Sequence, residues 1–310
     1  MTVPDLLNSL ALPVIAAPMT DVSGPELVIA ACRAGVVGAF PAHNAASTPE
    51  LHSWLGAITR AATAGSAPLA VNLIVHRSND RLDADLDVLI EHRVPIVITS
   101  VGSPVPVLDR LHDAGALVFA DVSSLRHVQR AVDAGVDGLV LLCSGAGGQT
   151  GTASPLAFVP AVRARFDGPI AVAGGIADGR ALWAAQVLGA DLGYLGTSFI
   201  TTHESLAAPE FKAALIGATL DDIVTTSGPS GLPANFLREW LAAHDIEPDT
   251  TGSYHQRRLF AHKNVWSAGH SVSAVTGEQS TAALVAQLAQ QYHAAREAGV
   301  RTATPPIQTH

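Results

Sequence analysis

The sequence is poor in several residue types, and each shortage excludes a class of protein. Charged side chains make up only 15% of the 310 residues, and the formal net charge is −9. Lys and Arg form no dense cluster in the sequence. An acidic chain without a basic patch binds polyanions poorly, so we expect no nucleic-acid partner. Cysteine occurs twice, as Cys32 and Cys143, both in apolar surroundings. This setting predicts two buried free thiols.

Long apolar runs are also missing. The longest, from Leu27 to Phe40, is interrupted by Arg33 and is too short to span a bilayer. The N-terminal stretch MTVPDLLNSL lacks the basic region and the long apolar region of a signal peptide. These shortages predict a cytoplasmic protein that does not associate with membranes.

What the chain does contain is a succession of short runs rich in Val, Ile, Leu and Ala. They are apolar nearly throughout rather than alternating, which is typical of parallel strands that are buried on both faces. We predict eight such strands: Pro13–Met19, Val36–Phe40, Pro68–Asn72, Pro95–Thr99, Ala116–Asp121, Asp137–Leu142, Pro169–Gly174 and Asp191–Gly196.

Amphipathic stretches occupy the intervals between these runs. Gly24–Gly35, Ser123–Gly135 and Asp178–Ala190 each carry, at or near the end, a glycine suited to a helix C-terminus. Eight strand–helix units in succession predict an α/β fold, a (β/α)₈ TIM barrel. A doubly wound open sheet is the alternative.

The pattern changes after Gly196. Residues 206–274 mix helical pieces with the Pro-, Gly- and Ser-rich stretch TTSGPSGLPANF. We interpret them as a small helical insertion or lid beside the mouth of a barrel that is formed by residues 1–205 and 275–300. A final helix is expected over Thr281–Gly299, and residues 301–310 are expected to be a loose tail.

Two glycine-rich turns follow the seventh and eighth predicted strands, AGGIADG (Ala173–Gly179) and GTSF (Gly196–Phe199). A Gly-Gly turn that opens a helix presents backbone N–H groups and the positive helix end to an anion. The loops at these two strands form the usual phosphate site of TIM barrels. We therefore predict a phosphate site, and simple tight turns are the alternative. Its residues would be Gly174, Gly175, Gly196 and Thr197.

Five motifs carry a family resemblance: AAPM, VNLIVHRSNDR, GAGGQTG, AGGIADG and LGADLGYLGTSFI. Their order and spacing resemble the nitronate monooxygenase family, also called 2-nitropropane dioxygenases. The similarity runs from Pro13 to about Ser205 and resumes at SGPSGLPANFL and WSAGHSVSAV. It implies a barrel that binds FMN without a metal. It also implies oxidation of an alkyl nitronate by O₂ to a carbonyl compound and nitrite, with the flavin supplying the electron chemistry.

The same resemblance assigns cofactor contacts. Ala17, Pro18 and Met19 would run beside the isoalloxazine ring, and Asn72 would hydrogen-bond its polar edge. Asp121, at the end of the fifth strand, is expected to orient a loop or a bound group. The ribityl chain and phosphate would be approached by Gly147, Gly148, Gly174, Gly175, Gly196 and Thr197.

The chain departs from the family at one position. The family's loop normally reads Gly-Gly-His, and this histidine removes the α-proton of neutral nitroalkanes, whereas the present chain has Gln149. An imidazole titrates near neutral pH, but a carboxamide can only donate and accept hydrogen bonds. Three interpretations stay open. Gln149 binds a preformed nitronate; or another residue supplies the base or the FMN chemistry has changed; or the protein binds flavin without turnover.

Three histidines are candidates for a replacement base. His270 stands where relatives tend to carry glutamine, His76 follows the third strand, and His43 follows the second. For His76 a structural hydrogen-bonding role is the favoured interpretation. The enzymatic alternative to a nitronate monooxygenase is an FMN-dependent enoyl reductase that uses NAD(P)H. The expected partners are a small-molecule substrate and O₂, and the apolar final helix is compatible with a homodimer.

Overall fold

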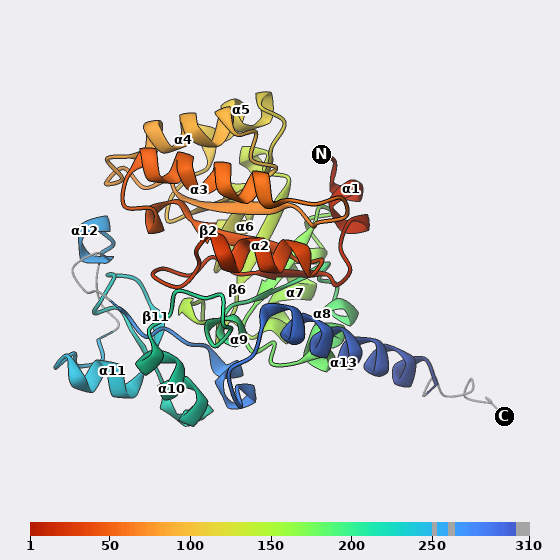
Figure 1. Cartoon of the computed structure of the whole chain (residues 1–310), viewed down its shortest axis with the longest axis vertical. Coiled ribbons are helices and arrows are strands. Elements are labelled where there is room, and N and C mark those ends of the chain that lie inside the picture. The colour runs from red at the N-terminus through yellow and green to blue at the C-terminus, as the bar shows by residue number, and fades with distance from the viewer. Residues whose placement is uncertain (250–252, 260–263, 302–310) are drawn as a thin grey trace.

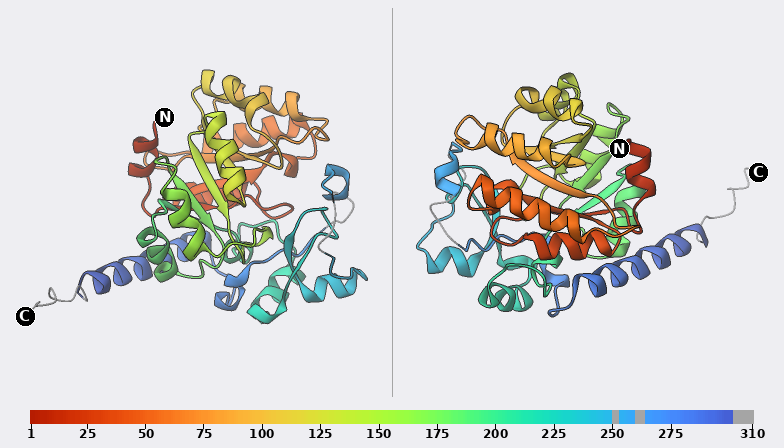
Figure 2. Two further views of the ribbon diagram at one scale, coloured as in Figure 1. Left: turned by 180° about the vertical axis from the view of Figure 1, so that it is seen from behind. Right: turned by 45° about the horizontal axis from the view of Figure 1, so that its top comes forward.

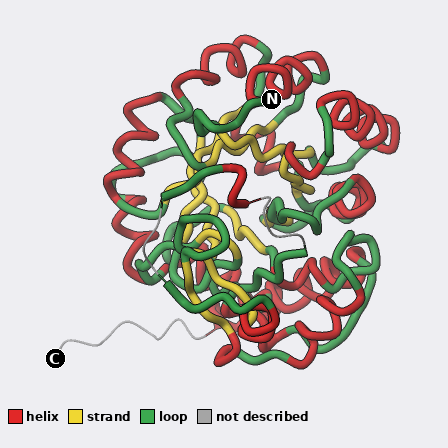
Figure 3. The backbone as a smooth tube through the Cα atoms, turned by 90° about the vertical axis from the view of Figure 1, so that its left-hand side faces the viewer, coloured by secondary structure: helices red, strands yellow, loops and turns green. Residues whose placement is uncertain are grey.

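The computed structural model describes residues 1–249, 253–259 and 264–301. Its centre is a closed barrel of parallel strands, and each predicted strand is confirmed within a few residues. Helices surround the strands (Figures 1 and 3). In order around the barrel the strands are β1 (Val14–Ala16), β2 (Val37–Pro41), β3 (Leu69–Ile74), β4 (Ile96–Ser100), β5 (Leu117–Val122), β6 (Gly138–Leu142), β8 (Ile170–Ala173) and β9 (Leu192–Leu195).

The hydrophobic core has two layers, one inside the barrel and one between the strands and the outer helices. Residues such as Ile98, Phe119 and Val140 fill the barrel interior, and their neighbours in sequence pack against the outer helices. A strand with both faces buried needs apolar side chains at every position, which explains the continuous runs. Helix α1 (Val3–Asn8) contributes Leu6 to the interior cluster.

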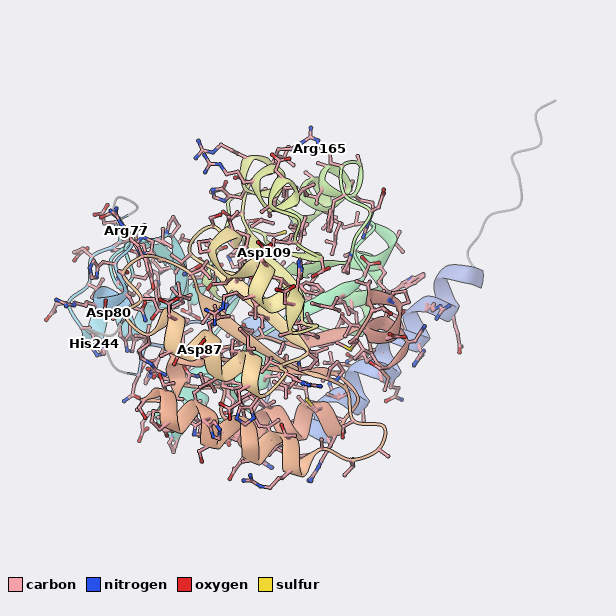
Figure 4. The ribbon with its side chains drawn as sticks, turned by 90° about the horizontal axis from the view of Figure 1, so that it is seen from above. Arg77, Asp80, Asp87, Asp109, Arg165 and His244 are labelled. Atoms are coloured by element: carbon pink, nitrogen blue, oxygen red, sulfur yellow. The ribbon has the colours of Figure 1, made fainter. Side chains whose placement is uncertain are left out.

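The outer layer follows the strand–helix alternation. It contains α2 (Pro25–Arg33), α3 (Thr48–Ala61), α4 (Leu82–Glu91), α5 (Val105–Asp113), α6 (Leu125–Ala134), α7 (Pro155–Arg163) and α8 (Gly179–Val187). Charged side chains lie on the outside of this layer and its loops, as Arg77, Asp87 and Arg165 do in Figure 4. No helix in the described ranges is both long enough and apolar enough to cross a membrane.

The eighth helical position is filled from far along the chain. β9 is followed only by the short α9 (Thr197–Ile200), and the long α13 (Thr281–Arg301) packs beside α8 and α2 (Figures 1 and 2). The side chain of Gln291 accepts a hydrogen bond from the N–H of Gly179 at 3.1 Å, and Tyr292 donates one to Gln186 at 2.5 Å. α13 therefore completes the ring of helices.

The segment from 206 to 274 contains helices and also two strands that the sequence analysis did not predict. Its elements are α10 (Pro209–Gly217), η2 (Leu220–Asp222), β10 (Ile223–Thr226), β11 (Ala234–Leu237), α11 (Arg238–Ala243), α12 (Gln256–Leu259) and η3 (His270–Ala274). β11 pairs antiparallel both with β10 and with β7 (Gly148–Gln149), which belongs to the glycine loop after β6. β10 and β11 have only four residues each, and the pairing of β11 with β7 joins segments far apart in sequence, so no clear local pattern marks this sheet.

Candidate active site

The barrel interior changes from apolar to polar at the carboxyl ends of the strands. Alternation along each strand turns Asn72, Ser100, Asp121 and Tyr194 toward the interior, above the apolar cluster. Asn72 is held by a hydrogen bond from its Nδ2 to the carbonyl oxygen of Ile98 at 3.0 Å, and Ser100 donates to its Oδ1 at 3.4 Å. These four side chains form the polar floor of a cavity.

The cavity lies between the barrel mouth and the 206–274 segment and contains about 1420 Å³ of empty space, its open mouth included. The upper walls are largely apolar and include Phe211 and Phe236 from the segment. The structure brings two catalytic candidates, Gln149 and His43, and every predicted cofactor residue to this one cavity. Those residues are Ala17, Pro18, Met19, Asn72, Asp121, Gly147, Gly148, Gly174, Gly175, Gly196 and Thr197.

The turn after β8 has the backbone that an anion site needs. Gly174 and Gly175 have φ angles of 123° and 74°, a region that side-chain-bearing residues rarely adopt. A Cβ on Gly175 would meet nothing within 4 Å, so the surface above this turn is open. Asp178 then caps α8 by accepting a hydrogen bond from the N–H of Ala181 at 2.8 Å. The turn can therefore admit a phosphate close to the backbone and to the N-terminus of α8.

The glycine loop that carries Gln149 is held from two sides. On the barrel side, the Thr150 hydroxyl donates to the carbonyl oxygen of Cys143 at 2.9 Å. On the other side, Gln149 pairs with Ala234 of β11, and the Asn235 amide donates to the carbonyl oxygen of Ala146 at 2.7 Å. This double attachment fixes the loop as one wall of the cavity and repays the entropy cost of ordering its glycines.

Asp121 is the acidic group on the cavity floor. Its Oδ1 is buried and has no hydrogen-bond partner within the described ranges. Burial raises the pKa of Asp121 from 3.8 to about 7. Tyr194 faces it, and burial together with the Asp121 charge raises the pKa of the Tyr194 phenol well above its usual value. The floor therefore holds one carboxyl group that titrates near neutral pH.

Among the three histidine candidates, His43 is the one that lines the cavity. Its Nε2 lies 3.0 Å from the Thr20 hydroxyl, and burial and the nearby Arg81 charge lower the pKa of His43 to about 4. The ring is therefore neutral at physiological pH. Its position at the rim agrees with its place directly after the second strand.

His76 and His270 are not among the residues that line the cavity. The Nδ1 of His76 is 2.8 Å from the Ser78 hydroxyl, and its ring meets Tyr254 edge-on. His270 is exposed, and its backbone N–H donates to the carbonyl oxygen of Gly145 at 2.9 Å. The structure therefore places neither ring on the wall of the cavity. Both look promising in the sequence only because they stand in motifs beside the site.

Sequence reasoning missed Tyr194 as a residue of the polar floor. Tyr194 lies two positions before Gly196, and residues two apart on a strand point to the same face. This alternation is the signal in the sequence that indicates Tyr194. Phe211 and Phe236 carry no such signal, because their place depends on how the 206–274 segment folds back.

A closed parallel barrel, whose strands end at a cavity with a polar floor and an open Gly-Gly turn, defines the class as a TIM barrel with a candidate site at the carboxyl ends of its strands. Within that class, the family model for nitronate monooxygenase matches residues 5–303. The chain therefore belongs to the nitronate monooxygenase family, as its motifs predicted.

Three proteins illustrate the range of similarity. A nitronate monooxygenase of Paraburkholderia phytofirmans is 28% identical, with 76% of each chain covered. A (3aS,4S,5R,7aS)-5-hydroxy-7a-methyl-1-oxo-octahydro-1H-indene-4-carboxyl-CoA dehydrogenase of Rhodococcus jostii is 30% identical over 73% of this chain and 62% of that protein. The solved nitroalkane oxidase of Streptomyces ansochromogenes is 25% identical with a TM-score of 0.83, over 94% of this chain and 99% of that one. Three curated relatives of 30 to 36% identity are matched over only 44 to 64% of their own lengths, so the chain spans less than two thirds of each.

Proposed function

We propose that this protein oxidises alkyl nitronates with O₂ to a carbonyl compound and nitrite, using FMN bound at the barrel mouth. The observation that carries the proposal is the single cavity that gathers Gln149 with all the expected cofactor residues. The residues present fit FMN, because an open Gly-Gly turn for a phosphate and the anchored amide of Asn72 lie in the same cavity. Bound FMN would supply the electron transfer between the nitronate and O₂.

The chain's own residues would position the reactants. The turn at Gly174 and Gly175 would hold the phosphate, and Ala17 to Met19 would pass beside the ring. The carboxamide of Gln149 would donate hydrogen bonds to the nitronate oxygens, which a preformed nitronate can accept without any base. Phe211 and Phe236 would exclude water from the alkyl part of the substrate. We further propose that the 206–274 segment acts as the lid of the cavity.

The test is oxygen uptake and nitrite release by FMN-loaded protein that is given preformed propane-2-nitronate. We expect turnover that depends on the protein, with FMN alone and the FMN-free protein as controls. A loaded protein that releases no nitrite, yet whose flavin is rapidly reduced by NADH or NADPH, would contradict the proposal in favour of an enoyl reductase activity.

A second candidate function rests on the 30% identity to the Rhodococcus jostii dehydrogenase. Because Gln149 departs from the family's usual histidine, the same site could serve dehydrogenation of a CoA thioester. Flavin reduction by an acyl-CoA under anaerobic conditions, without nitrite chemistry, would favour this function.

A further inference from the structure

The cavity presents three titratable side chains among the described residues: His43, Asp121 and Tyr194. A substrate with an acidic C–H needs an acceptor that is free to take a proton at neutral pH. Gln149 cannot serve, since a carboxamide does not titrate in this range. The replacement for the family's histidine is therefore to be sought among these three groups.

Two of the three are poorly suited. His43 is engaged with the Thr20 hydroxyl, and the nearby Arg81 charge and burial oppose its protonation. The phenol of Tyr194 keeps its proton at neutral pH, because burial and the Asp121 charge both raise its pKa. Tyr194 is thus a neutral neighbour of Asp121 rather than a competitor for the proton.

Asp121 has the geometry of a proton acceptor. β5 places its side chain inside the barrel, on the cavity floor, and its Oδ1 is buried without a hydrogen-bond partner in the parts of the chain that the structure describes. A buried oxygen that lacks a partner is costly, and it is tolerated where a ligand supplies the missing hydrogen. An ordinary C–H group is not such a donor. An acidic α-C–H of a bound substrate, however, can transfer its proton to this oxygen.

We propose that the carboxylate of Asp121 removes the α-proton of neutral nitroalkanes, so that this chain makes its own nitronate in the cavity where it is oxidised. The inference rests on the proposed function and extends its substrates from nitronates to nitroalkanes. In the step, the α-C–H bond breaks and an O–H bond forms on Asp121. The electron pair moves to the nitro group, whose oxygens Gln149 would bind, and the proton then leaves to solvent through the cavity mouth.

The environment of Asp121 supports this role. Its pKa of about 7 leaves a useful fraction ionised at neutral pH and makes the ionised form a far stronger base than an exposed carboxylate. The groups that surround it on the floor are Tyr194 from β9, Ser100 from β4 and Asn72 from β3, while His43 lines the same cavity from the loop after β2. None of these is charged at neutral pH, so the base strength follows from burial.

The experiment compares wild type with Asp121→Asn, both loaded with FMN, on 2-nitropropane and on preformed propane-2-nitronate. We expect the variant to lose about 100-fold or more of kcat/KM for the nitroalkane, the size of a typical general-base contribution. Because a preformed nitronate needs no base, the ratio of the nitroalkane kcat/KM to the nitronate kcat/KM should fall by a similar factor. Asp113→Asn, an exposed aspartate at the end of α5, is the matched control and should leave both activities unchanged.

Two further readouts separate a base from a structural role. The nitroalkane rate of wild type should rise through an apparent pKa near 7 and show a primary isotope effect with α-deuterated substrate. In the FMN-free protein, carboxyl ¹³C NMR should show a resonance that titrates near pH 7 and is absent from Asp121→Asn. If Asp121→Asn does not fold, Asp121→Ser replaces it in the same comparison.

Each outcome decides between the proposals. Retained nitroalkane turnover in the variant overturns the role of Asp121, and so does equal loss on both substrates, which would indicate a cofactor-binding role. Wild-type turnover of the nitronate alone also overturns it. If wild type oxidises neither substrate, the proposed function itself is wrong and the inference fails with it.

Discussion

The side-chain amide of Asn235 donates a hydrogen bond to the carbonyl oxygen of Ala146 at 2.7 Å, across 89 residues of sequence. The same side chain accepts a hydrogen bond from the Thr225 hydroxyl at 2.5 Å. Asn235 is only 1% exposed, so both groups are satisfied away from water. The position of the glycine loop, and with it that of Gln149, therefore depends on a residue of the 206–274 segment.

Replacing Asn235 should loosen this attachment. We expect Asn235→Ala to lower the free energy of unfolding by about 1–3 kcal/mol, since it leaves a buried carbonyl oxygen without its donor. It should also raise KM for the nitronate more than it lowers kcat, because the substrate would meet a mobile loop. Denaturant unfolding and steady-state kinetics check the two effects. Asn235→Asp keeps the acceptor for Thr225 but loses the donor, so a variant as stable as wild type would argue against the Ala146 bond.

The proposed phosphate site can be tested with a matched pair of glycines. Gly175 and Gly115 have similar φ angles, 74° and 81°, and a Cβ on either meets nothing within 4 Å. Each change to alanine should therefore cost about 1–2 kcal/mol of stability through the left-handed backbone alone. Only Gly175→Ala should weaken FMN binding, by about tenfold, because only Gly175 lines the cavity. Fluorescence titration with FMN measures this, and equal affinities would contradict the phosphate site.

The missing histidine can be restored. In the Asp121→Asn background, Gln149→His should raise nitroalkane turnover at least about 10-fold, since an imidazole at this wall of the cavity can accept the α-proton. The gain should appear as pH rises through the pKa of the new histidine. Gln149→Asn in the same background serves as the control. An unchanged rate would show that this position does not reach the α-carbon.

Stability should depend on pH through Asp121. Burial raises its pKa from 3.8 to about 7, so the folded protein keeps a proton that the unfolded chain has already lost. The contribution of this proton to the free energy of unfolding is fully present below pH 3.8 and is lost as pH rises to about 7. The stability advantage of Asp121→Asn over wild type, both FMN-free, should therefore grow by about 2 kcal/mol between pH 5 and 7 and then level off. Denaturant unfolding across this range checks it, and a constant difference would contradict the raised pKa.

The sequence predicted the barrel well because the signals for it are local. Each strand is a short apolar run, several helices such as α2, α5, α6 and α8 end near a glycine, and the residues at strand ends, such as Asn72 and Gly175, follow from strand position alone. The pairing of Gln149 with Ala234 could not be predicted in the same way, since two residues of strand in a glycine loop leave no periodic pattern. The orientation of His270, exposed beside Gly145, likewise depends on tertiary packing.

α13 gives the barrel a late closing step during synthesis. The ribosome delivers the eight strands and the 206–274 segment before the helix that covers the gap between α8 and α2, where Gln291 and Tyr292 dock. Until then the apolar sides of both helices face water at this gap. A nascent chain that stalls after the cavity is built would thus carry an exposed apolar seam, which the docking of α13 covers.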